Sequence, residues 1–574
     1  MQGTRAIKAG LAAGAGLGAL IAAQSALAAP ASSEDARIAK LEAAVATLQA
    51  EVAQTQQLTQ QNAALQGQVS QLQGAASENA ELKQEVGQLQ AQVADLKATT
   101  VAQISDVRQA QAAAPTVAFP GGRPTFATPD GKFTASLRGQ LQLDTAAYFQ
   151  PGAGPIGTDL RRDGPALGSS ATNVDLAHAR DLKDGTVWRR ARVGLEGTAY
   201  SDWDYRLLVD FGGSGVENAG QLYEAWLQYS GFKPFHARIG AWSQPIGLED
   251  GGNTNTQMFL ERPAISDLAR GLAAGDTRIG AGVFGYTSDW FLSSDITGRT
   301  IGVVNTGTAI TSTTSGNTGT AQSFGDQIGY VGRADYSFHG GDWRVLGGVH
   351  GSYVIHPADS VGPSATGALA VNDFLVTLKD TPELRVDGTQ FINTGAIDAS
   401  HASTIGAEFA AQKGPFFVQG EYESIHVNRT DPGTDSPTFW GWYAEGSVFL
   451  TGESRQYTAS SATFDGPAIK RPFSLKNGGP GAWEFVARYD DADLNFEAGP
   501  PGNAPSASTI RGGDEQVWAL GLNWYPVSAV KFGFDIDRVM LERLSPNATN
   551  FQTPTGAEIG QAYTALAVRS QVAF

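Results

Sequence analysis

Three arginines lie in or just after one long segment, residues 243–275. Arg262 and Arg270 belong to the segment, and Arg278 follows it where an alternation of apolar residues begins. A guanidinium group stays charged at physiological pH and binds oxyanions through paired hydrogen bonds. A ring of such groups could bind phosphate-like anions and pass them along a passage. We predict an anion-binding role for all three residues.

Six more arginines occur where polar and apolar residues alternate. They are Arg190, Arg192, Arg206, Arg333, Arg488 and Arg569. Acidic residues alternate in phase with them, as Asp210 does with Arg206 and Asp490 with Arg488. An arginine paired with a neighbouring carboxylate serves structure rather than solute binding. Both interpretations, a charged lining and a set of ion pairs, stay open for these six residues.

Motifs of enzyme chemistry are weak in this sequence. The stretch GAGVFG at 280–285 fits a dinucleotide-binding pattern, but no helical pattern follows it. The seven histidines lack the spacing of a zinc site, and Asp490, Asp491 and Asp493 lack the Gly and distal Glu of a calcium loop. We predict no catalytic residue, no metal site and no cofactor, and therefore no enzyme.

The composition narrows the class of protein further. The chain has 574 residues, no cysteine, 70 glycines and a formal net charge of −17. The acidic balance argues against nucleic acid as a partner, and the lack of cysteine excludes disulfides and thiolate metal sites. A mean hydropathy of −0.19 does not fit a bundle of membrane helices.

Residues 1–28 have the order of a secretory signal peptide. Arg5 and Lys8 precede a run of Ala, Gly and Leu, and Ala26-Leu27-Ala28 fits the small-residue cleavage rule. An uncleaved anchor helix is the alternative, although the apolar core is short for one. We expect an exported chain that starts near Ala29.

Residues 29–112 predict an α-helical coiled coil, because apolar residues repeat at alternating spacings of three and four. The three runs are Ile38, Leu41, Val45, Leu48 and Val52; Leu58, Asn62, Leu65, Val69 and Leu72; and Leu82, Val86, Leu89, Val93 and Leu96, in which Asn62 is the one polar residue. A single solvated helix is the alternative, but it would leave this stripe in water. A coiled coil implies an oligomer. Residues 113–130, rich in Pro and Gly, predict a linker.

Beyond residue 130 the apolar period changes to two, which is the period of a β-strand. The sixteen segments that show it are 131–149, 187–200, 203–212, 220–229, 236–242, 276–286, 289–297, 326–338, 342–356, 403–411, 415–427, 437–450, 481–494, 514–525, 529–540 and 562–574. Short turns join them at every second connection and long loops at the others, except that 451–480 is long on the short-turn rim. This order predicts an antiparallel transmembrane β-barrel over residues 131–574.

The alternation also predicts which face of the barrel meets lipid. Tyr205, Leu207 and Val209 alternate with Arg206 and Asp210, and aromatic residues gather at strand ends on the apolar face. Membrane barrels carry such aromatic girdles at both interfaces. A soluble sandwich or propeller also alternates, but it would bury the aromatic face.

Four segments of this region resemble, in order, blocks of the phosphate-selective porin O and P family. They are WRRARVGLEGTAYSDWDYRLLVDF, RIGAWSQPIGLED, FLTGESRQY and GAWEFVARYDDADL. The resemblance runs over most of 131–574 and ends in ALAVRSQVAF, whose final aromatic resembles the signal read by the barrel insertion machinery. It implies a trimeric sixteen-stranded barrel in the outer membrane, preceded in some members by a coiled coil, with a pore that favours small anions such as phosphate.

In barrels of this size the longest inward-folded loop commonly follows the fifth strand. We therefore expect residues 243–275 to constrict the pore and to bring Arg262, Arg270 and Arg278 to it. Family members commonly carry Phe-Lys before this block, whereas this chain has Trp242-Ser243. Because this lysine is missing and the net charge is acidic, a general or cation-preferring pore is the alternative.

The expected location is the outer membrane, with the coiled coil in the periplasm. The expected partners are further copies of the chain in a homotrimer, outer-membrane lipid, small inorganic or organic ions and, through the coiled coil, peptidoglycan. A structural tether between the membrane and the cell wall is therefore a second function open to this chain.

Overall fold

The computed structural model describes two compact units, Met1–Gly131 and Lys132–Phe574. The described residues are 79–150, 161–163, 174–179, 182–213, 220–275, 277–301, 327–356, 375–381, 383–546, 555–556 and 558–574, with isolated positions between 43 and 64. The predicted signal peptide and the first two apolar runs of the predicted coiled coil lie outside them.

The first unit contains one long described helix, α3 (Asn79–Ala113). It ends just before Pro115, as expected because the residue before a proline disfavours helical geometry. The pair β1 (Thr116–Ala118) and β2 (Thr125–Ala127) follows and flanks the 3₁₀ turn η3 (Pro120–Gly122). Leu89 and Leu96 of the third apolar run are 49% and 66% exposed, so the coiled coil that would cover them stays a prediction. Among the described residues, no helix combines the length and apolar character needed to cross a bilayer.

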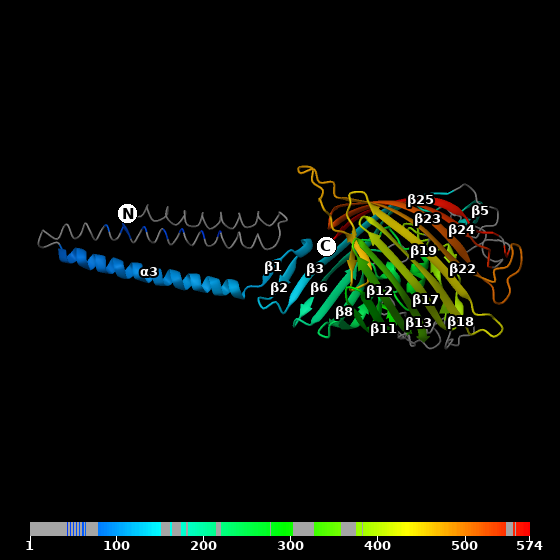
Figure 1. Cartoon of the computed structure of the whole chain (residues 1–574), viewed down its shortest axis with the longest axis horizontal. Coiled ribbons are helices and arrows are strands. Elements are labelled where there is room, and N and C mark those ends of the chain that lie inside the picture. Colours follow the sequence, from blue (N-terminus) through cyan, green and yellow to red (C-terminus); the bar gives the residue numbers. More distant parts are fainter. Residues whose placement is uncertain are drawn as a thin grey trace, which may run out of the picture. The chain divides into compact units, whose positions relative to one another are not determined.

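The second unit is a closed antiparallel ring of 16 strands, as predicted (Figure 1). The strands are β3 (Thr134–Phe149), β6 (Gly185–Ala199), β7 (Trp203–Asp210), β8 (Gln221–Tyr229), β9 (Phe235–Trp242), β10 (Arg278–Tyr286), β11 (Trp290–Thr300), β12 (Ile328–Gly340), β13 (Trp343–His356), β17 (Ile397–Lys413), β18 (Phe416–Arg429), β19 (Thr438–Phe449), β22 (Ala482–Phe496), β23 (Ile510–Val527), β24 (Val530–Glu542) and β25 (Ala562–Ala573). Each pairs with the next, and β25 closes the ring on β3 with Val572 opposite Leu141.

The two faces of the wall differ as the alternation predicts. On β25, Val568 and Val572 point outward and are 45% and 42% exposed, whereas Arg569 between them points inward and is 3% exposed. Closing the sheet leaves no strand edge with unpaired backbone groups, which a hydrocarbon environment requires. The apolar outer face therefore meets lipid, and the charged side chains lie inside.

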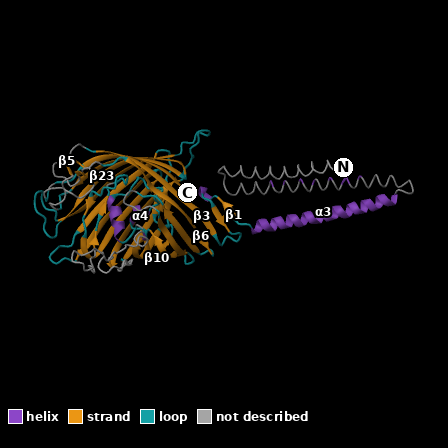
Figure 2. Ribbon diagram, turned by 180° about the vertical axis from the view of Figure 1, so that it is seen from behind, coloured by secondary structure: helices purple, strands orange, loops and turns teal. Residues whose placement is uncertain are grey.

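Three connections carry short elements that bear on the interior. The connection from β9 to β10 contains α4 (Gly247–Gly251) and α5 (Ala264–Leu272), and α4 is seen within the ring in Figure 2. The connection from β13 to β17 contains β14 (Leu375–Val376), β15 (Lys379–Asp380) and β16 (Ile392–Asn393). The connection from β19 to β22 contains β20 (Arg455–Thr458) and β21 (Thr463–Pro467). A further short pair, β4 (Arg161–Asp163) and β5 (Val174–Ala179), lies between β3 and β6.

A dry core fills one side of the barrel interior. Ile265 and Leu268 of α5, Phe391 beside β16, Ile425 of β18 and Val539 of β24 belong to one buried cluster. The helix α5 is amphipathic, with Asp267 in its first turn and Arg270 in its last, which suits the helix dipole. Because this side is packed with apolar groups, solvent-accessible space is left toward the opposite wall.

A charge placed in the middle of the outer face should destabilise the barrel. Ile536 lies midway along β24 and is 39% exposed. We expect Ile536→Arg to lower the free energy of unfolding in lipid vesicles by about 2–4 kcal/mol, since an arginine is costly at the bilayer midplane. The matched control Val527→Arg, at the end of β23, should cost only about 0–1 kcal/mol. Urea titrations followed by tryptophan fluorescence measure both, and equal losses would contradict an outer face immersed in lipid.

Candidate functional site

Three segments enter the barrel interior and define the space that remains. They are loop 243–277 between β9 and β10, loop 375–396, which is the described part of the connection between β13 and β17, and turn segment 450–481 between β19 and β22. The first two start from the long-loop rim. The third is the long connection that breaks the predicted pattern on the short-turn rim, and it enters the interior from that side.

Glu261 is the main ionic anchor of loop 243–277. Its carboxylate accepts hydrogen bonds from Arg189 at 2.6 and 3.1 Å and from Arg569 at 3.1 Å, and Arg488 donates to its backbone carbonyl at 3.0 Å. Burial raises the pKa of Glu261, but the neighbouring charges of Arg189, Arg569 and Arg190 outweigh it and hold the pKa well below its ordinary value. The loop is thus held by wall arginines from three strands.

A β-bulge in β6 turns two successive arginines toward the interior. Gln142 of β3 pairs with Arg190 and Leu143 pairs with Trp188, which leaves Arg189 as the extra residue. Both arginines are buried, at 4% and 2% exposure, and Arg190 donates to the Gln142 side chain at 2.7 Å. Strict alternation points Arg189 at lipid, so the sequence prediction missed it.

The other end of loop 243–277 is held at α4 by buried carboxylates. Glu421 accepts from the backbone N–H groups of Leu248 and Glu249 and from the Tyr443 hydroxyl. Gly247 has φ of 82°, and a Cβ there would lie 1.9 Å from Oε1 of Glu421. Only glycine therefore allows this approach.

A histidine lies beside this anchor. The two ring nitrogens of His350 are 2.8 Å from Glu408 and 2.5 Å from Glu423. The candidate ligand atoms of His350, Glu408 and Glu421 lie within 4.8 Å of one another, a grouping that comes from three strands and is invisible to motif spacing. Both ring nitrogens of His350 are thus bonded to carboxylates within a buried hydrogen-bonded network.

Wall arginines also hold the other two inserted segments. Arg333 donates to the carbonyls of Ser461 and Ala462 at 2.6 and 3.2 Å, and Arg455 of the turn segment pairs with Glu484 at 2.7 Å. Arg488 contacts Glu383 of loop 375–396 as well as Asp490 of its own strand. Loop 375–396 also meets α5 through an ion pair of Arg385 with Asp267.

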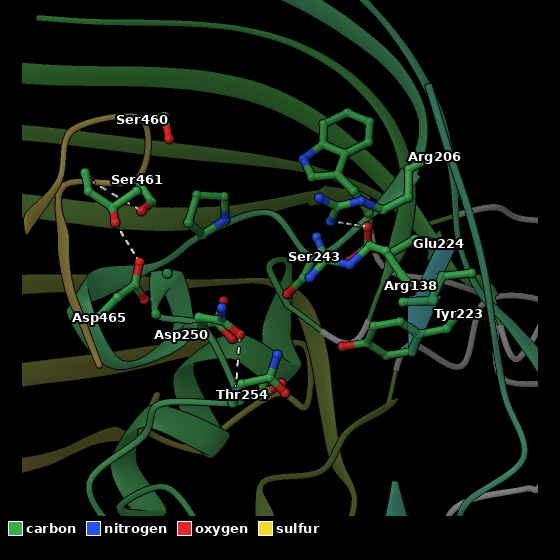
Figure 3. Close-up of a pocket in the computed structure, with 18 of the residues that line it drawn as sticks. Arg138, Arg206, Tyr223, Glu224, Ser243, Asp250, Thr254, Ser460, Ser461 and Asp465 are labelled. Atoms are coloured by element: carbon green, nitrogen blue, oxygen red, sulfur yellow. Dashed lines mark hydrogen bonds and ion pairs between the residues drawn. The ribbon is translucent and has the colours of Figure 1, made fainter. Parts of the chain in front are cut away.

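A cavity of about 360 Å³ remains between strands β3 and β6–β11 on one side and loop 243–277 and turn segment 450–481 on the other (Figure 3). Among the described residues, five arginines line it, Arg138, Arg192, Arg206, Arg238 and Arg262. Four acidic residues also line it, Glu224, Asp250, Asp295 and Asp465. The cavity thus carries both charges, and the strand side of it holds most of the arginines.

The three arginines predicted for the loop occupy different places. Arg262 lines the cavity, with one guanidinium nitrogen 3.9 Å from Asp267. Arg270 donates to Asp250 at 2.5 Å. Arg278 donates to the carbonyls of Gly271 and Ala274 at 2.7 and 3.0 Å and so fixes the end of the loop.

The six further arginines divide into two groups. Arg192 and Arg206 line the cavity together with Arg262. Arg190, Arg333, Arg488 and Arg569 lie among wall and loop groups, as described above. Ion pairs are present in both groups, since Arg192 of the first contacts Asp210 at 2.7 Å and Arg569 of the second contacts Asp144 at 2.7 Å.

Two cavity arginines were not among the sequence candidates. Arg138 pairs with Glu196 at 2.9 Å. Arg238 donates to Gln228 at 3.0 and 2.6 Å, and its guanidinium carbon lies 4.4 Å from the Trp226 ring centre. No ion pair of Arg238 occurs within the described ranges. The alternation in RIGAW of β9 places Arg238 on the inner face with Trp242, and this signal could have identified it.

Comparisons with known proteins identify the family of this chain. The family model of phosphate-selective porin O and P matches residues 166–564. Porin O of Pseudomonas aeruginosa is 26% identical over 447 residues, which cover 73% of this chain and 86% of that protein. The structure of outer-membrane expressed OmpT of Vibrio cholerae covers 77% of this chain and 98% of its own, with 9% identity and a TM-score of 0.41. An anion-selective porin from Comamonas acidovorans covers 77% and 100%, with 13% identity and a TM-score of 0.39.

Removing the charge of Glu261 should loosen loop 243–277. We expect Glu261→Gln to lower the free energy of unfolding at neutral pH by about 3–5 kcal/mol, because buried guanidinium groups lose their counter-charge. A carboxylate with a lowered pKa stabilises the folded state above its unfolded pKa, about 4.3, and this contribution is lost as the pH falls through the folded pKa. The difference from wild type should therefore shrink in acid.

Urea titrations at neutral and acidic pH measure this difference. Glu497→Gln, an exposed position between β22 and β23, is the control and should change stability little at either pH. A pH-independent loss in Glu261→Gln would speak against the ionic anchor.

Proposed function

Because the chain belongs to the phosphate-selective porin O and P family, we propose that its barrel is a water-filled channel for small solutes with a weak preference for anions such as phosphate. The family and the closed barrel are those of an outer-membrane porin, which is a channel rather than an enzyme. The preference for anions, the constriction and the trimer are the proposed parts.

The arginine-lined cavity is the observation that carries the proposal. Arg138 and Arg206 share the carboxylate of Glu196, and Arg206 also contacts Glu224, whereas Arg238 has no ion pair within the described residues. Arg238 adds a guanidinium whose central carbon lies 4.4 Å from the ring centre of Trp226 and 5.0 Å from that of Phe284. Charged groups in a narrow, low-dielectric passage act on solutes more strongly than on an open surface.

Ser243 explains why the proposed preference is weak. It lines the cavity at the position where family members commonly carry a lysine. Four acids line the same space, and Asp295 and Glu224 lie on the strand side with the arginines. A passage with both charges and one base fewer should favour anions without binding phosphate tightly.

The constriction in this proposal is built from two directions. Loop 243–277 supplies Asn253 and Thr254 to the cavity lining, and turn segment 450–481 supplies Ser460 and Ser461. Buried ion pairs hold both segments against the wall, so we expect them to narrow the passage without moving.

Removing loop arginines should shift the channel toward cations. We expect Arg262→Ala with Arg270→Ala to move the reversal potential in a potassium chloride gradient toward that of a cation-preferring pore. The first change removes a charge from the cavity lining, and the second leaves Asp250 without its 2.5 Å partner. Planar-bilayer recordings measure the potential.

The control for this experiment is Lys476→Ala, which removes one charge from an exposed position of the turn segment. It should leave the reversal potential unchanged. An unchanged potential in the double variant would remove these two arginines from the selectivity mechanism.

A trimer held partly by α3 is the second part of the proposal. Leu89 and Leu96 are exposed on the helix at heptad spacing, and parallel packing of three copies would bury them. The helix belongs to the periplasmic segment in this proposal, because the linker leads from it to the start of the barrel.

Cysteine cross-linking can test this packing, since the natural chain contains no cysteine. We expect Leu89→Cys to form disulfides between chains on mild oxidation, because core positions of a coiled coil face each other. Ala91→Cys, on the outward side of the heptad, should stay unlinked. Non-reducing gels measure the products, and equal cross-linking at both positions would contradict the predicted seam.

A further inference from the structure

The cavity has two chemically different sides, and from this we infer that it prefers hydroxylated organic anions, such as sugar acids, over organic anions of similar size that lack hydroxyl groups. The inference rests on the proposed channel function and specifies the class of solute that the channel takes. Three features of the cavity support it.

The first feature is the strand side, which offers guanidinium groups to a carboxylate. The side chains of Arg138 and Arg206 are 26% and 27% exposed, and both line the cavity. Arg238 lies over aromatic rings, with Trp242 a third ring at 5.6 Å. Guanidinium groups bind carboxylates in bidentate fashion, so this side can hold the acid group of a solute.

The second feature is the opposite side, which offers groups that bind hydroxyls. Thr458, Ser460 and Ser461 line the cavity there, together with the carboxylate of Asp465. Figure 3 shows Asp465, Ser460 and Ser461 facing Arg138 and Arg206 across the space. Asp465 accepts hydrogen bonds from the hydroxyls of Thr256 and Thr458 and is partly exposed, so it can accept further hydroxyl donors.

The charge of Asp465 discriminates between solutes. No ion pair of Asp465 occurs within the described parts of the chain. A carboxylate repels an organic anion that has no hydroxyl group, but it accepts a hydrogen bond from the alcohol groups of a hydroxylated one. An anion that touches both sides of the cavity must therefore carry hydroxyl groups.

The third feature is a set of buried polar atoms in the lining that lack partners. The Ser293 hydroxyl and Nε of Arg262 belong to buried residues of the cavity lining, and neither atom has a hydrogen-bond partner among the described residues. These two atoms are therefore free to exchange hydrogen bonds with water or with the hydroxyl groups of a solute. A space of about 360 Å³ is in the range of sites for small organic molecules.

Competition between two matched anions tests the inference. Glucuronate and cyclohexanecarboxylate both join a six-membered ring to one carboxylate, and only glucuronate carries hydroxyls. We expect glucuronate to block the single-channel chloride current at about a tenfold lower concentration, as hydrogen bonds to buried partners contribute factors of this size.

Two variants separate the two sides of the cavity. Asp465→Asn should narrow the ratio between the two half-blocking concentrations to about twofold, because it removes an acceptor and relieves the repulsion of the hydroxyl-free anion. Arg238→Gln should weaken the block by both anions in parallel and leave their ratio unchanged. Asp289→Asn, in the turn between β10 and β11, is the control and should change neither value.

Equal half-blocking concentrations for the two anions in the wild type, or an unchanged ratio in Asp465→Asn, would overturn the inference. If Asp465→Asn does not yield a folded barrel, Ser460→Ala at an exposed position should shift the ratio in the same direction and serves in its place. A wild type without any chloride current would instead refute the channel itself, which is a separate result.

Discussion

The structure depends on one constraint, that no backbone polar group can be left unpaired in hydrocarbon. The 16-stranded ring meets it because every strand has two neighbours and β25 returns to β3. The outer face must then be apolar. Because side chains alternate along a strand, the polar side chains of each strand point to the interior. The arginines and acids of this acidic chain are concentrated there as a result, where each must find a partner or meet water.

The interior solves this problem in two ways. On one side, apolar residues of α5 and of loop 375–396 pack against the wall, and the arginines there donate to loop carbonyls and carboxylates. On the other side, the cavity keeps arginines partly exposed. Arg569 and Arg206 illustrate the difference, since the first is 3% exposed and bonded to Asp144 and Glu261, whereas the second has a side chain that is 27% exposed. Whether an arginine anchors an inserted segment or lines the cavity is therefore decided by where it lies relative to these segments.

The two-residue period of apolar side chains and the turn residues between the segments were enough to predict the strands, because both are local features of the sequence. The sixteen predicted segments correspond to the sixteen strands of the ring, and the inward placement of Arg192, Arg206 and Arg569 follows from the same alternation. Features that break the period could not be predicted in this way. The bulge that turns Arg189 inward inserts one residue into the register, and the group of His350, Glu408 and Glu421 is assembled by strand pairing. The long connection 451–480 stood out in the sequence, but only the contacts of Arg333 and Arg455 reveal that it enters the barrel.

Turn segment 450–481 can vary in sequence independently of the barrel wall. One side of the passage comes from a hairpin, β20 and β21, that is attached through side chains such as Arg455 and is not part of the hydrogen-bonded ring. Its residues can change without altering strand register or the membrane-facing surface. Substitutions in this hairpin can therefore change which solutes the channel accepts, while the barrel wall and its assembly stay the same.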